Sequence, residues 1–189
     1  MKRHVLAVAL VLGSALPAVA QQFGTASGKG TMNRSVPHPK SESLDDAYEK
    51  VSFSPRFSFA FREKKATETS TWIVFTEKQP PVKEALASNR LETLRLWCGK
   101  EKSSFIAMSL DGKMAPQSYF LCAGDARITS EGVNVANGLA SIVVKFQTQT
   151  ANRLKGTLRT GQGSCSQPDG PPRYCEDTGD FTFDAPIVR

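Results

Sequence analysis

The chain has 189 residues, of which 40% are hydrophobic, with a formal net charge of +6, 14 glycines, 11 prolines and four cysteines. This composition excludes a collagen-like, coiled-coil or wholly disordered chain, and at about 150 residues per domain it favours a single globular domain. The excess of lysine and arginine suits a partner that carries negative charge.

The first twenty residues have the three parts of a secretory signal peptide. Lys2 and Arg3 form a basic start, an apolar run covers 5–12, and Ala18-Val19-Ala20 has the small-x-small pattern that signal peptidase reads. We therefore predict cleavage after Ala20, a mature chain of 169 residues with a charge of +4, and a periplasmic or secreted location. No later segment reaches the roughly 20 apolar residues of a transmembrane helix, so none is expected in the mature chain.

The remaining chain divides at a change in composition. Residues 21–45 are small and polar and include Val36-Pro37-His38-Pro39, which predicts a flexible N-terminal segment, although 22–33 also suits an edge strand. Residues 46–189 alternate between apolar and polar positions in several stretches, which predicts one β-rich domain.

The four cysteines are an even number in an oxidising compartment, which favours two disulfides. Of the three pairings we prefer Cys98–Cys122 and Cys165–Cys175, because the second closes a polar loop with Pro-Asp-Gly and Pro-Pro turn signals. A zinc site made of the four cysteines is disfavoured, since the sequence contains no C-x-x-C pair. We expect no metal and no cofactor.

Most predicted elements of the domain are strands. Phe53, Phe57, Phe59 and Phe61 share one parity, which predicts one apolar face of a strand. Residues 71–76 (TWIVFT) predict a central strand covered on both faces. Two prolines then precede good helix formers, so we predict a helix near 81–98 with Gly99 as its C′ residue.

The stretch 91–98 also alternates well enough for a strand, and the preferred disulfide favours the helix. In a three-stranded meander Cys98 and Cys122 would lie two strands apart, about 9.5 Å, whereas a disulfide tolerates at most about 7 Å between Cα atoms. A hairpin at Asp111-Gly112-Lys113 and strands near 139–147, 153–159 and 180–188 complete the prediction. The expected class is α+β: a predominantly antiparallel sheet or sandwich of seven to eight strands, with one helix and two disulfides.

Common catalytic groups are scarce in this sequence. His38 is the only histidine of the mature chain, so no Ser-His-Asp or Cys-His set is available, and the expected disulfides remove the thiolates. A hydrolase of envelope glycans, which would use two carboxylates about 5–9.5 Å apart, is therefore the alternative enzymatic function. Its candidate carboxylates are Asp45, Asp46, Glu49, Asp177, Asp180 and Asp184.

Export, disulfides and the lack of catalytic groups favour a non-catalytic binding or interaction domain of the bacterial cell envelope or extracellular space. The predicted contact residues are Arg159, Arg173 and Tyr174, in or near the 165–175 loop, because recognition residues are often placed on loops of a rigid scaffold. Basic residues suit a protein partner or an anionic envelope polymer, whereas no motif for reading nucleic acid is present. A structural envelope component is a further alternative.

Overall fold

The structure is a computed structural model that describes residues 23–35, 48–64, 68–88, 90–122, 131–134, 140–167, 170–175 and 178–188. Within these ranges the pairing of strands is almost entirely antiparallel, which confirms the predicted β-rich class with helix. The strands are β1 (Gly24–Ser35), β2 (Tyr48–Phe53), β3 (Phe57–Lys64), β4 (Thr69–Thr76), β5 (Phe105–Leu110), β6 (Pro116–Cys122), β7 (Glu131–Asn134), β8 (Ala140–Gln149), β9 (Arg153–Gln167), β10 (Gly170–Cys175) and β11 (Thr178–Val188). The helices are α1 (Val82–Ala85) and α2 (Arg90–Glu101).

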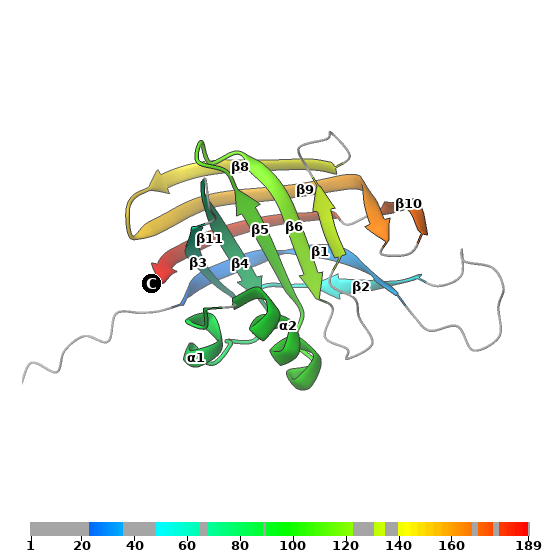
Figure 1. The fold of residues 1–189 in the computed structure, drawn as a ribbon, viewed down its shortest axis with the longest axis horizontal. Coiled ribbons are helices and arrows are strands. Elements are labelled where there is room, and N and C mark those ends of the chain that lie inside the picture. The colour runs from blue at the N-terminus through cyan, green and yellow to red at the C-terminus, as the bar shows by residue number, and fades with distance from the viewer. Residues whose placement is uncertain are drawn as a thin grey trace, which may run out of the picture.

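The described strands form one sheet in the order β10-β9-β11-β1-β3-β4-β5-β6-β7, with β2 paired to β1 and β8 paired to β9 (Figure 1). Strands β3 to β7 lie side by side in sequence order, and β8 pairs with β9, which pairs with β11. β1 joins the two groups, because it pairs with β11 along one edge and with β2 and β3 along the other. The sheet curls until β7 lies beside β9. The curled sheet therefore has a concave inner side and a convex outer side.

Each side of the sheet has its own hydrophobic cluster. The inner cluster brings together distant strands, with Ile73 of β4 and Phe183 of β11 among its members. The outer cluster lies between the sheet and the helices, where Trp72 of β4 packs in one group with Leu94 of α2. β4 therefore supplies side chains to both clusters, and this confirms the predicted central strand covered on both faces.

The phenylalanine row is only partly as predicted. Phe57, Phe59 and Phe61 of β3 belong to the outer cluster, but Phe53 of β2 belongs to the inner one. The prediction of a single face was wrong for Phe53 because residues 54–56 are not in a strand. That interruption separates β2 from β3 and changes the side to which odd-numbered residues point.

The predicted helix is present in two pieces and ends later than expected. α1 ends at Ala85, and α2 begins at Arg90 and continues through Gly99 to Glu101. The helix terminates at Lys102, which has a positive φ of 49°, and the Ser103 N–H donates to the Cys98 carbonyl at 3.2 Å. This is the hydrogen bond of a Schellman cap, so Lys102 occupies the C′ position that the sequence assigned to Gly99.

The N-terminal segment contains a long strand within the predicted flexible range 21–45. β1 covers Gly24–Ser35 and lies inside the sheet, between β11 and the β2–β3 pair, and not at an edge. The glycines of this segment are typical of a flexible chain. Gly28 instead has a φ of 127°, and a β-carbon at this residue would lie 2.1 Å from the carbonyl oxygen of Asp180. The glycine therefore permits a close approach of β11 that other residues would prevent.

The segment predicted as a polar loop over 165–175 is largely a pair of strands. β9 extends to Gln167, and β10 covers Gly170–Cys175, with an interrupted register between Gly170 and Arg173. Pro171 and Pro172 lie at this interruption, which is where a sheet tolerates proline. The structure has more strands than the predicted seven to eight, because β10 and β11 follow one another along β9, as β2 and β3 do along β1.

One of the two predicted disulfides is present. Cys98 of α2 and Cys122 of β6 are bonded, with 6.4 Å between their Cα atoms, and the bond ties the helix to the sheet from its outer side. The Cys165–Cys175 bond stays a prediction, because the described part of the chain gives only the backbone of these two residues. That backbone places them on paired strands, with Cys165 opposite Arg173 and Cys175 opposite Gly163.

Candidate functional site

The outer side of the sheet is covered by helices over β3 to β6 but not over β1, β8, β9 and β11 (Figure 1). Alternation along β9 explains the composition of this uncovered part. Leu154 and Leu158 are buried in the inner cluster, so Lys155 and Arg159 point outward. We call the outward side chains of the four strands the polar face. Its members are Thr25, Ser27, Lys29, Val143, Lys145, Gln147, Arg153, Lys155, Thr157, Arg159, Asp180, Thr182 and Asp184.

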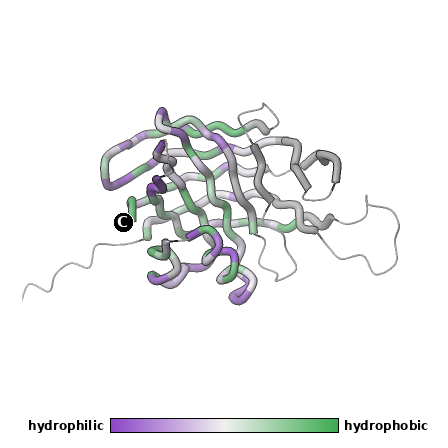
Figure 2. The backbone as a smooth tube through the Cα atoms, in the orientation of Figure 1, coloured by the Kyte–Doolittle hydropathy of each residue, from purple (hydrophilic) through white to green (hydrophobic). Residues whose placement is uncertain are grey.

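The register of the strands arranges these residues in rows. The middle row runs across four strands and is mostly hydroxyl-bearing: Lys145, Thr157, Thr182 and Ser27. The row on one side has Lys155 opposite Asp184, and the row on the other side has Arg159 opposite Asp180. A band of hydroxyl groups thus lies between two rows of charges. Figure 2 shows how hydrophilic the β8–β9 hairpin is at the end of this face.

Two cross-strand ion pairs hold the carboxylates of the polar face. Arg159 donates to Asp180 from Nη2 at 2.6 Å and from Nε at 3.2 Å. Arg153 Nε donates to Asp184 Oδ1 in the same way. The hydrogen bond from Arg153 lowers the pKa of Asp184 below its ordinary value, and the charges of Arg153 and Lys155 act in the same direction. The pKa of Arg153 is raised by the same hydrogen bond, so this pair is ionised at neutral pH.

Positive charge is in excess on the polar face. Its five cations are Lys29, Lys145, Arg153, Lys155 and Arg159, and its two anions are Asp180 and Asp184. Both anions are paired with arginines, so the three exposed lysines have no salt bridge within the described part of the chain. An excess of three positive charges around a band of hydroxyl groups favours a ligand with negative charge.

A groove of about 310 Å³ crosses the polar face, within the range of about 300–1,000 Å³ found for ligand sites. Its polar lining comes from all four strands: Thr25, Ser27, Gln147, Lys155, Thr182 and Asp184. Ser27 Oγ and Thr182 Oγ1, both in this lining, share a hydrogen bond of 2.6 Å. The groove therefore offers an ammonium group, a carboxylate, an amide and hydroxyl groups in one place.

The predicted contact residues are placed unevenly. Arg159 belongs to the polar face, as a member of an ion pair. Arg173 and Tyr174 lie on β10, opposite Cys165 and Ser164 of β9, and their side chains are outside the described set. Lys145 of the polar face and Ser27 of the groove were not among the contact residues predicted from the sequence. Alternation along β8 gives a signal for Lys145, whereas only the register with β11 brings Ser27 to this place.

The carboxylates proposed for a hydrolase do not form a pair on the described strands. Asp180 and Asp184 are four residues apart on β11, which corresponds to about 13 Å along a strand, beyond the upper limit of about 9.5 Å for a catalytic pair. A general acid also needs a raised pKa, and that of Asp184 is lowered. Asp45, Asp46 and Asp177 are outside the described residues, and Glu49 is described only by its backbone.

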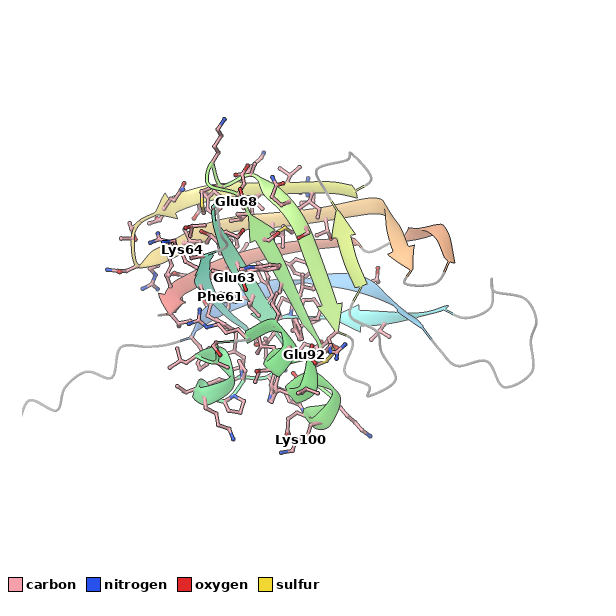
Figure 3. All side chains as sticks on the ribbon, in the orientation of Figure 1. Phe61, Glu63, Lys64, Glu68, Glu92 and Lys100 are labelled. Atoms are coloured by element: carbon pink, nitrogen blue, oxygen red, sulfur yellow. A yellow bond between two sulfur atoms is a disulfide. The ribbon has the colours of Figure 1, made fainter. Side chains whose placement is uncertain are left out.

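A second cavity, of about 500 Å³, lies on the outer side beside the start of α2. Its lining includes Glu63 and Glu68, which lie above the helices in Figure 3. In its lining, Trp72 Nε1 donates to Glu63 at 3.1 Å. The Arg90 guanidinium lies 4.8 Å from the centre of the Phe61 ring. Burial lowers the pKa of Arg90, and the charge of Glu63 opposes this shift.

On the opposite wall of this cavity, Asp111 accepts hydrogen bonds from the backbone N–H groups of Lys113 and Ala115, each at 2.8 Å. Ser109 and Ser118 bond to one another through their hydroxyl groups at 2.7 Å. The polar groups around this cavity thus take part in contacts that hold the helices and the hairpin turn in place. The polar face is the better candidate site, because within the described residues its three lysines and Gln147 take part in no side-chain hydrogen bond or salt bridge.

Comparison with known protein families, curated protein sequences and solved structures finds no match to this chain. Its function therefore has to come from its own residues. Neither helix of the described part is long and apolar enough to cross a membrane. The same residues contain no group of three or more histidine, cysteine, aspartate or glutamate side chains that could hold a metal ion.

Proposed function

We propose that this chain is an exported, non-catalytic binding domain that recognises an anionic partner in the cell envelope or extracellular space through the polar face. One observation carries the proposal: five cations and two paired carboxylates surround a groove of about 310 Å³ on a part of the sheet that neither of the two described helices covers. Such a surface concentrates anions near the groove.

Export is supported by two independent features. The first twenty residues have the order of a signal peptide, and Cys98 and Cys122 form a disulfide, which is typical of oxidising compartments. Expression of the full chain in a bacterium, followed by mass spectrometry of the protein from the periplasm and medium, tests this part. We expect a mature N-terminus at Gln21, whereas an uncleaved protein retained in the cytoplasm would contradict it.

Binding is tested with paired variants of equal charge. Lys145→Gln/Lys155→Gln removes two lysines of the polar face, and Lys64→Gln/Lys100→Gln removes two exposed lysines elsewhere. Lys64 lies on β3, and Lys100 lies at the far end of α2, away from β8 and β9 (Figure 3). Both variants change the net charge by the same amount, so a difference between them reports the location of the site and not the overall charge.

The three proteins are mixed with lipopolysaccharide, vesicles that contain phosphatidylglycerol, and pectate gel, and the bound fraction is measured after sedimentation. We expect at least one material to bind the wild type and the control variant equally, with affinity for the polar-face variant about tenfold lower or more. Equal binding by the two variants, or no binding to any material, would overturn the proposal. Equal retention in an insoluble envelope fraction would instead favour the structural alternative.

A further inference from the structure

We propose that the ligand of the polar face is an acidic polysaccharide, bound in an extended form across the strands. This inference rests on the proposed function and names the chemical class of its anion. Four features of the face support it: the use of its backbone N–H groups, the spacing of its cations, the chemistry of its groove, and the scarcity of apolar side chains among its described residues.

Most backbone N–H groups at the centre of the face, on β9 and β11, are used in strand pairing and are not free to bind a compact anion. β9 pairs with β8 on one edge and with β11 on the other, and β11 pairs in turn with β1. Sites for phosphate and similar compact anions are commonly built from unpaired backbone N–H groups at helix N-termini or in nests. Side chains therefore supply most of the groups that can bind a ligand on this face.

The cations of the face are spread out and do not converge. Lys145 of β8 lies opposite Thr157, midway between Lys155 and Arg159 on β9. Strand geometry then puts the Cα atom of Lys145 about 8 Å from that of each neighbour. Separate cations at such intervals suit a polymer that carries its negative charges at intervals along its length better than a small ion with several charges.

The groove combines groups that a purely anionic ligand would not use. Asp184 lies beside Lys155, and Gln147, Thr182 and Ser27 complete its polar lining. A phosphate group facing Asp184 would be repelled, whereas a sugar hydroxyl can donate a hydrogen bond to that carboxylate. An acidic polysaccharide supplies both kinds of group: carboxylates for Lys145 and Lys155, and hydroxyl groups for Asp184, Gln147 and Thr182.

A lipid surface fits this face less well than a glycan. Proteins that bind in the plane of a membrane bury an apolar surface in it. Among the described residues of the polar face, Val143 is the one large hydrophobic side chain that is well exposed. The remaining outward residues are charged or carry hydroxyl or amide groups.

The test measures affinities by calorimetry for five probes. They are polygalacturonate, the same polymer with its carboxylates fully methyl-esterified, monomeric galacturonate, sodium triphosphate, and phosphatidylglycerol vesicles. We expect polygalacturonate to bind the wild type. Esterification, or Lys145→Gln/Lys155→Gln, should weaken that binding about tenfold or more, and Lys64→Gln/Lys100→Gln should leave it unchanged. Monomeric galacturonate should bind far more weakly than the polymer, because linked contacts reinforce one another.

Thr182→Val separates recognition of hydroxyl groups from electrostatic attraction. This exposed residue on β11 can lose its hydroxyl without a change in charge, and Ser27→Ala removes the partner of its hydrogen bond. We expect either variant to weaken polygalacturonate binding severalfold while the dependence on salt stays the same, since that dependence reports charge contacts. Unchanged affinity in both variants would contradict a role for the groove in binding sugar hydroxyls.

Failure of this inference is distinguishable from failure of the proposed function. Binding to triphosphate or vesicles through Lys145 and Lys155, with none to polygalacturonate, would overturn the polysaccharide assignment and leave an anion-binding face. No binding of any anionic probe that depends on these lysines would overturn both.

Discussion

At the scale of single residues, Gly156 sets the distance between β8 and β9. It is buried, and a β-carbon on it would lie 2.1 Å from the carbonyl oxygen of Lys145. Gly156→Ala must therefore push the two strands apart, and we expect the free energy of unfolding to fall by about 1–3 kcal/mol. Urea denaturation measures this change.

Gly112→Ala is the matched control for this substitution. Gly112 lies in the β5–β6 turn, and a β-carbon there would meet no atom within 4 Å. Its effect should stay within about 0.5 kcal/mol. Equal stability of Gly156→Ala and Gly112→Ala would contradict the close approach of β8 and β9 at Gly156.

A second prediction at this scale concerns the pH dependence of the Arg153–Asp184 pair. The pKa of Asp184 is lower in the folded chain than its ordinary value of 3.8, chiefly because Arg153 donates a hydrogen bond to it. A lowered carboxyl pKa stabilises the fold above the ordinary pKa, and this contribution is lost as the pH falls through the folded value.

Asp184→Asn removes that contribution, and we expect a loss of about 0.5 kcal/mol at pH 7, because exposed ion pairs contribute little. The difference from the wild type should shrink as the pH falls below 3.8. Thermal unfolding between about pH 3 and pH 7 measures it. A difference that stays constant over this range would contradict the ion pair as its cause.

At the scale of elements, α2 is held to the sheet by packing and by a covalent bond. Leu94 and Trp97 of α2 are buried, and the Cys98–Cys122 disulfide joins the last turns of the helix to β6. The bond closes a loop with a sequence separation of 24, for which the entropic model gives about 3 kcal/mol.

Cys98→Ala/Cys122→Ala should therefore lower the free energy of unfolding by about 3 kcal/mol, while far-ultraviolet circular dichroism stays unchanged because Leu94 and Trp97 still anchor the helix. Chemical denaturation under non-reducing conditions measures the loss. A variant as stable as the wild type, or free thiols at these positions in the wild type, would contradict this account of α2.

Local patterns predicted the elements whose surroundings are simple. Residues 71–76 are apolar on both faces, and β4 is covered on both faces. The Cys98–Cys122 pairing also excluded a strand for 91–98, and α2 lies there. The break between β2 and β3 was not predictable, since Ser54-Pro55-Arg56 does not reveal on which side the chain continues.

Elements that depend on their neighbours were predicted less well. The glycines of β1 have the same composition as a flexible linker, and only the close passage of β11 gives them a structural role. Pro171 and Pro172 likewise indicated a loop, although β10 accommodates them at an irregularity in its pairing. Composition describes a residue's own freedom, whereas these segments are ordered by contacts far away in the sequence.

At the scale of the whole molecule, the curled sheet divides its outer side into two parts. The helices cover β3 to β6, and the polar face occupies β1, β8, β9 and β11. The sequence indicated Arg159, and alternation alone could have indicated Lys145 and Lys155. Ser27 and Thr182 are 155 residues apart and meet only because β1 closes the sheet against β11. The groove could therefore not be predicted without the register.

The central claim is that anionic ligands bind on the polar face, and the most direct measurement is an NMR titration of the isotope-labelled protein with dextran sulfate fragments. We expect the amide shifts to change around Lys145, Lys155 and Thr182, and the changes to decrease as salt is added, because exposed charges are screened. The amide chemical shifts of α2 should not change. Changes centred on α2 or on the cavity beside Glu63, with none on β8, β9 and β11, would contradict the account.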